Sequence, residues 1–206
     1  MTPGQALVTF VLAAGVLTLT PGLDTMLVVR TAVADGRRAA TLAALGISTG
    51  VLGWGALVAA GLGVLLRASP VAYAALTYVG AAYLVATGVR MITRPRGTLE
   101  GAGPAAGRDA PFRRGLLTNL LNPKVGVFYV SFLPQFVPTG WPLAPTVLGL
   151  AALHAGMGTA WLAGLAAGSG RLAATLRSGP VVGVLDQLTG GVFVAFGLRL
   201  ALNRMP

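Results

Sequence analysis

One stretch of the sequence places a proline, a glycine and an acidic residue inside a long apolar run, at Thr20-Pro21-Gly22-Leu23-Asp24. Proline lacks a backbone donor and clashes with the preceding turn, so we expect a helix to break here. The break frees the carbonyl of Leu17 and exposes the amides of the following half-helix, and in hydrocarbon both must find partners. A zwitterion suits them, because its ammonium can meet carbonyls and its carboxylate can meet a positive helix N-terminus. The alternative is a kink that neighbouring helices repair.

Asp24 adds a charge to this break. An ionisable residue inside an apolar span is costly and by default marks a transport pathway or a proton site. Two roles are open, because Asp24 can be the counter-charge for a substrate ammonium or can carry a proton. The alternative to both is that Asp24 only caps the second half-helix.

A second break is expected at Asn119-Leu120-Leu121-Asn122-Pro123-Lys124. Here Pro123 frees the carbonyl of Asn119, and the two asparagine side chains add amide donors and acceptors. Lys124 adds a cation, opposite in sign to Asp24, and each charge follows shortly after its proline. An ion pair, or a substrate that both residues hold, explains the two charges. The alternative is that Lys124 snorkels to the cytoplasmic interface.

His154 is the single histidine of the chain and lies inside another apolar run. The chain has no cysteine, and His154 has no acidic neighbour, so we predict no metal and no cofactor. His154 is either a proton relay or pore-lining donor, or it forms a hydrogen bond to a neighbouring helix. The residues predicted to bind a substrate or to couple its transport are Pro21, Gly22, Asp24, Asn119, Asn122, Pro123, Lys124 and His154.

The composition indicates an integral membrane protein. Of the 206 residues, 55% are hydrophobic and 10% are charged, whereas a soluble domain has about 25% charged residues. Uninterrupted uncharged runs of 28, 22 and 46 residues lie between charged positions, and one crossing takes about 20 apolar residues. The net charge of +10 comes from arginines that punctuate the apolar runs, which is typical of helix-end anchors and not of a surface for nucleic acid.

The alternation of apolar runs with charged residues predicts an all-α, polytopic membrane protein of six transmembrane helices in one domain, residues 1–206. The expected spans are 4–34, with its break near Pro21, and 39–66, 68–92, 112–137, 143–168 and 180–202. Residues 93–111 have the composition of a linker and separate repeat 1, about 1–92, from repeat 2, about 112–206. Because each half has three spans, the halves enter the membrane in opposite directions, as in the inverted repeats of many secondary transporters.

The distribution of arginine predicts the orientation. With the N-terminus outside, the inside connections collect 11 arginines and the outside collects 3. Cytoplasmic loops carry the excess of Lys and Arg, so both termini are expected outside the cytoplasm. Residues 1–20 contain no Lys or Arg for the n-region of a signal peptide, and we expect them to form a retained first helix.

Several motifs are spread over nearly the whole chain. They are Pro21-Gly22-Leu23-Asp24, Gly36-Arg37-Arg38, Gly46, Gly50, Gly80-Ala81-Ala82-Tyr83-Leu84 with Gly88, Phe112-Arg113-Arg114-Gly115-Leu116-Leu117-Thr118-Asn119-Leu120-Leu121-Asn122-Pro123-Lys124 and Phe132-Leu133-Pro134-Gln135-Phe136. Together they resemble the LysE/RhtB family of bacterial amino-acid exporters. The resemblance implies a six-helix exporter of the inner membrane, driven by the proton-motive force, for substrates that range from lysine and arginine to threonine, homoserine and leucine.

Two positions depart from the family pattern. The first motif usually reads Pro-Gly-Pro, and here its third position is Leu23. The family also often has an acidic residue after the glycine that matches Gly50, and here that residue is Val51.

The sequence therefore predicts a secondary transporter that exports amino acids or related small zwitterions, coupled to protons, with neutral substrates favoured. Its expected partners are the amino-acid substrate, protons and the lipid bilayer of the bacterial plasma membrane, with no nucleic acid and a possible homo-oligomer. Efflux of another small metabolite or cation is the alternative. A membrane-embedded enzyme is the remote one, because Asp35-Gly36-Arg37-Arg38-Ala39 lacks the later aspartates that a metal-dependent phosphotransferase needs.

Overall fold

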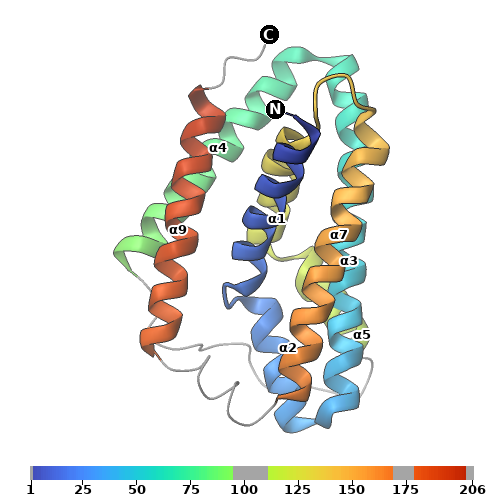
Figure 1. Ribbon diagram of the computed structural model, residues 1–206, viewed down its shortest axis with the longest axis vertical. Helices are drawn as coiled ribbons and strands as arrows, with labels where there is room; N and C mark the ends of the chain where they lie inside the picture. Colours follow the sequence, from blue (N-terminus) through green and yellow to red (C-terminus); the bar gives the residue numbers. More distant parts are fainter. Residues whose placement is uncertain (1, 95–110, 169–178, 203–206) are drawn as a thin grey trace.

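A computed structural model describes residues 2–94, 111–168 and 179–202 of the chain. Every regular element in these ranges is helical (Figure 1). The predicted linker lies largely in residues 95–110, outside the described residues, as do Arg171 and Arg177. The expected all-α class is confirmed.

The first expected break is present. Helix α1 spans Pro3–Leu19 and begins with a capping box, in which the Thr2 hydroxyl accepts from the Gln5 amide and the Gln5 side chain accepts from Thr2. The chain is extended at Thr20, and α2 spans Leu23–Ala34 at an angle of 48° to α1. Pro21 cannot donate to the helix, so the ladder of α1 ends directly before it.

The second break opens a longer irregular region than the sequence predicted. Helix α5 spans Pro111–Leu120, and α6 restarts at Pro123 and ends at Val127. The winding of the chain then first widens, in the π-helix η1 over Phe128–Phe132, and afterwards tightens, in the 3₁₀ helix η2 over Leu133–Phe136. The expected span 112–137 is therefore four short helices, and π-helical turns of this kind are frequent at functional sites.

The four long helices agree with the expected spans to within a few residues. They are α3 (Gly36–Ala68), α4 (Pro70–Thr93), α7 (Leu143–Ala167) and α9 (Gly179–Leu202). By length and apolarity, α3 over Gly36–Gly61 and α7 can each cross a membrane, and the bent pair α1–α2 gives a third such span if the two helices are counted as one. Six crossings stay a prediction.

Glycines bring two pairs of helices into backbone contact. A Cβ on Gly46 of α3 would overlap the carbonyl of Phe112, and one on Gly115 of α5 would overlap the carbonyl of Ala43. The α4–α9 pair, side by side in Figure 1, is equally close, because a Cβ on Gly88 would lie 2.6 Å from the carbonyl oxygen of Gly190. Close approach of this kind is the usual mode of helix association in lipid.

Two apolar clusters form the core. The larger joins α1, α3, η1, η2 and α7 and includes Phe10, Phe128 and Phe132, whereas the smaller joins α2, α3 and α7 and includes Val28, Ile47 and Leu165. Residues of both clusters, among them Val51 of the larger and Leu162 of the smaller, border the polar side chains at the two breaks.

Candidate functional site

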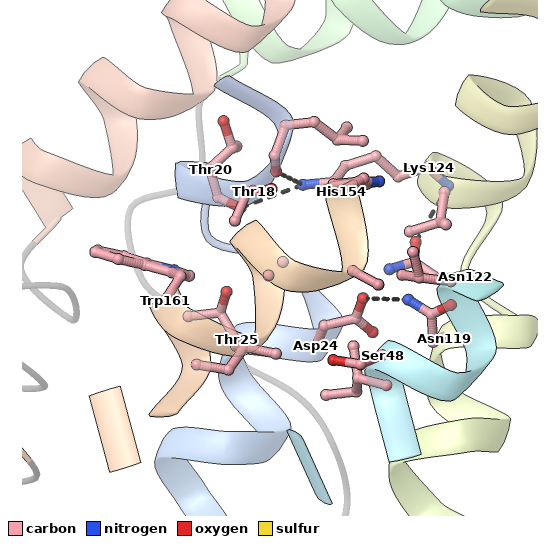
Figure 2. A pocket seen from close by; sticks show the side chains of 18 residues that line it. Thr18, Thr20, Asp24, Thr25, Ser48, Asn119, Asn122, Lys124, His154 and Trp161 are labelled. Carbon is pink, nitrogen blue, oxygen red and sulfur yellow. Dashed lines mark hydrogen bonds between the residues drawn. The ribbon is translucent and has the colours of Figure 1, made fainter. Parts of the chain in front are cut away.

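A cavity lies at the two helix breaks (Figure 2). The space open to the centres of water molecules is about 50 Å³, enough for several waters or one small solute. Its walls come from α1, α2, α3, α5, α6 and α7. The polar residues that line it are Thr18, Thr20, Asp24, Thr25, Ser48, Asn119, Asn122, Lys124, His154 and Trp161.

Asp24 and Asn119 connect the two breaks. The Asn119 amide donates to Asp24 Oδ2 at 2.8 Å, between residues 95 positions apart in the chain. Asn119 is fully buried, and it fits only because Gly50 of α3 has no side chain, since a Cβ there would lie 2.7 Å from Asn119 Oδ1. Asp24 lies in the first turn of α2, whose N-cap is Gly22, so Asp24 is not the N-cap residue.

Lys124 binds the free carbonyl groups at the C-terminal end of α1. Its ammonium donates to the carbonyl of Leu17 at 3.1 Å and to that of Thr20 at 3.2 Å. Pro21 was expected to free the Leu17 carbonyl for a substrate ammonium. In the structure the ammonium that binds this carbonyl is that of Lys124. Lys124 thus reaches into the molecule toward the first break and lines the cavity there, as the interpretation that links the two charges requires.

The carbonyl that Pro123 was expected to free, that of Asn119, also has partners. It accepts from the Asn122 amide at 3.0 Å and from Trp54 Nε1 at 3.4 Å. The Asn122 side chain caps α6 by accepting from the Lys124 amide at 3.1 Å. The carbonyl freed at the second break is therefore satisfied by neighbouring groups of the protein.

His154 forms a hydrogen bond to another helix. Its Nδ1 lies 2.9 Å from the hydroxyl of Tyr129 in η1, and the two rings stack with centroids 5.7 Å apart. The residue is 5% exposed and lines the cavity. This is the second of the two roles that the sequence left open, and its place on the cavity wall keeps the first open as well.

The sequence predicted no role for several cavity residues. Thr20 contacts Thr189 of α9 through their hydroxyls, and Ser48 Oγ lies 2.6 Å from the hydroxyl of Thr159. Thr18 and Trp161 complete the wall. One local signal existed, because Thr20 directly precedes Pro21; the others are isolated polar residues in apolar helices. Asp186 is also buried, in α9.

Unused hydrogen-bonding groups converge on this cavity. In the described part of the chain, four buried side-chain polar atoms have no hydrogen-bond partner: Thr18 Oγ1, Asp24 Oδ1, Asn119 Oδ1 and Trp161 Nε1. All four residues line the cavity. Water or a polar solute in the cavity can satisfy these groups, each of which would otherwise cost about 1–3 kcal/mol. No three metal-ligating side chains gather within residues 2–94, 111–168 and 179–202.

Comparison with known proteins identifies the family of this chain. The family model described as LysE type translocator matches residues 15–204. An uncharacterized membrane protein of Pseudomonas aeruginosa is 33% identical over 94% of this chain and 93% of its own length. The homoserine/homoserine lactone efflux protein of Salmonella typhi is 29% identical over 95% of both chains. An uncharacterized membrane protein of Bacillus subtilis is 26% identical over 97% of this chain and all of its own.

No solved structure matches the chain. The family match covers more than half of the sequence and includes both helix breaks. The chain therefore belongs to the LysE-type translocator family of multi-pass membrane efflux transporters, and it is a transporter and not an enzyme.

Proposed function

We propose that the protein exports small amino acids of zero net charge, such as homoserine or threonine, from the bacterial cytoplasm in exchange for protons. The observation that carries the proposal is the set of unpartnered polar atoms around one cavity at the two helix breaks. Homoserine is named for the Salmonella typhi relative, which aligns with this chain over 95% of its length.

The cavity offers complementary groups for the two ends of an amino acid. Asp24 Oδ1 is a buried acceptor with no partner among the described residues, and an ammonium supplies it with a donor and a charge. Gly22 caps α2 without a side-chain hydrogen bond, so the positive end of α2 is available to a carboxylate. Lys124, 3.4 Å from the Cβ position of Gly22, adds positive charge at the same place.

The charge balance supports a neutral substrate. Asp24 and Lys124 attract each other across the cavity, and their formal charges cancel. Val51, which stands where relatives often have an acid, lines the cavity and is buried. A lysine or arginine substrate brings a second positive charge for which the lining residues offer no second carboxylate. An unpaired charge in such a site costs several kcal/mol.

Asp24 also provides a route to proton coupling. A carboxylate that accepts from a substrate ammonium cannot be protonated at the same time, so substrate and proton compete for Asp24. A proton arriving from outside then displaces the substrate, and loss of that proton to the cytoplasm restores the site. This competition is sufficient for exchange, in which the inward proton gradient drives export.

We further propose that the two halves form an inverted repeat of six crossings, with both termini outside. The helix pairings support it. In an inverted repeat, α1 corresponds to α5, α3 to α7 and α4 to α9. The contacts α3–α7 and α4–α9 then each join an element to its own counterpart, and the contact α3–α5 corresponds to the contact α7–α1. All four pairs are in contact. The larger apolar cluster on the α1 side and the smaller one on the α2 side then serve as the two gates of an alternating-access cycle.

Transport by the purified protein in proteoliposomes tests the substrate class. With an imposed proton gradient, we expect homoserine and threonine to be carried at least about tenfold faster than lysine, because one uncompensated charge disfavours lysine. Dissipating the gradient with a protonophore is expected to stop uphill transport of homoserine. Faster transport of lysine contradicts the neutral preference, and transport of neither amino acid favours efflux of another small metabolite.

Gly50 provides a second prediction. Gly50→Ala is expected to lower homoserine transport about tenfold or more, because the added Cβ would lie 2.9 Å from Asn119 Cβ and push this buried side chain away from Asp24. Gly53→Ala, one turn along α3, is the matched control, since its Cβ would meet only Leu120 Cδ2 at 3.5 Å. Equal transport by the two variants would show that the Asn119–Asp24 contact does not matter.

A further inference from the structure

Two unpartnered groups of the cavity are not used by the ammonium and carboxylate of an amino acid. They are the Trp161 indole N–H on α7 and the Thr18 hydroxyl on α1, both buried and both without a partner in the described residues. Figure 2 shows Trp161 on the side of the cavity away from Asn119 and Asn122, with Asp24 between them. This separation leaves Trp161 facing the far end of a substrate held at Asp24, and Thr18 lines the same cavity from α1, beside Thr20.

Thr18 is exceptional among the hydroxyl residues of the apolar helices. The hydroxyls of Thr9, Thr49 and Thr159 each donate to the carbonyl four residues earlier, at 2.7 to 2.9 Å, which is the usual way to satisfy such a group in a helix. Thr18 has no such bond although it is in the last turn of α1. Its hydroxyl is thus left available at the cavity wall.

Trp161 is exceptional among the tryptophans. Trp54 donates its indole N–H to the Asn119 carbonyl, and Trp141 is 52% exposed before α7 begins. Trp161 packs its ring against the smaller apolar cluster, yet its N–H is buried without an acceptor. Buried indole N–H groups usually have a partner, and the indole N–H only donates. The missing partner is therefore a hydrogen-bond acceptor.

We propose that Trp161 and Thr18 form a side-chain subsite that selects amino acids carrying a hydrogen-bond acceptor at the end of a short side chain. The hydroxyl oxygen of homoserine accepts from Trp161 Nε1, and the Thr18 hydroxyl completes the pair. An apolar side chain of the same length leaves both groups buried and unsatisfied. A site of this kind rejects an analogue that lacks the polar group far more strongly than it distinguishes one methylene. The proposal rests on amino-acid export as the proposed function.

Norvaline is the matched probe, because it is homoserine with a methyl group in place of the hydroxyl. In proteoliposomes with an imposed proton gradient, the wild-type protein is expected to carry homoserine at least about tenfold faster than norvaline. Trp161→Phe keeps an aromatic ring and removes the N–H, and Thr18→Val keeps the shape and removes the hydroxyl. Each variant is expected to lower homoserine transport and to raise norvaline transport, because norvaline then leaves one donor fewer without an acceptor, so that the preference of about tenfold is lost.

The controls separate the subsite from folding and from the proposed function. Trp141→Phe changes an exposed tryptophan outside the cavity and is expected to keep the wild-type preference. Norvaline transport shows that each variant is folded and active. A wild-type preference in both Trp161→Phe and Thr18→Val overturns the subsite, as does a wild-type protein that carries norvaline as fast as homoserine, although amino-acid export then stands. If neither amino acid is carried, the proposed function fails and the subsite fails with it.

Discussion

Replacing Asp24 by Asn is expected to abolish export, with homoserine transport reduced about 100-fold or more in proteoliposomes. The substitution preserves the shape of the side chain, and the remaining carbonyl can still accept from the Asn119 amide, as Asp24 Oδ2 does at 2.8 Å. The other oxygen, Oδ1, becomes an NH₂ group. The cavity then presents a donor where the substrate ammonium needs an acceptor and a negative charge.

Two modes of transport distinguish the roles of Asp24. If Asp24 only carried a proton, Asp24→Asn would stop uphill export and leave downhill movement of homoserine intact. We expect both to stop, because the same carboxylate holds the ammonium and the proton in turn. The matched control is Asp35→Asn, which removes an exposed carboxylate at the end of α2 and is expected to transport normally. Undiminished uphill export by Asp24→Asn would remove Asp24 from the mechanism.

The helices and their breaks are predictable because their signals are local. Long uncharged runs bounded by arginine, proline or glycine define α3, α4, α7 and α9 to within a few residues. Pro21 and Pro123 interrupt the hydrogen-bond ladder wherever they stand in a helix, so each break follows from one residue. The π-helical turns of η1 carry no comparable local signal, and Pro134, at the start of η2, was not used to predict a further break, so one continuous span was expected after Pro123.

The site was only partly predictable, because its contacts join residues distant in the chain. The sequence indicated that the Leu17 carbonyl needs a partner, but the partner, Lys124, lies 107 residues away and depends on how the two breaks pack together. Thr18 and Trp161 are ordinary in an apolar helix until their missing hydrogen bonds are known. The charges that mark a membrane site are visible in a sequence, whereas neutral groups that complete it require the fold.

Replacing Lys124 by Met is expected to reduce homoserine transport about 100-fold and to lower the thermal stability of the purified protein. The substitution leaves the Leu17 and Thr20 carbonyls, at 3.1 and 3.2 Å from the lysine ammonium, without this donor, and each buried carbonyl left unsatisfied costs about 1–3 kcal/mol. It also leaves Asp24 without the positive charge that attracts it across the cavity. Arg113→Met is the matched control, since Arg113 is exposed on α5.

The double variant Asp24→Asn with Lys124→Met separates charge balance from capping. If the two charges stabilise each other, removing both is expected to cost less stability than the sum of the single changes, by about 1–3 kcal/mol. Transport is expected to remain absent, because the variant lacks both the Asp24 carboxylate that binds the substrate ammonium and the Lys124 hydrogen bonds to the carbonyls at the end of α1. Additive losses of stability would show that Lys124 acts only through the α1 carbonyls. Normal transport by Lys124→Met would show that the end of α1 does not need this cation to form the site.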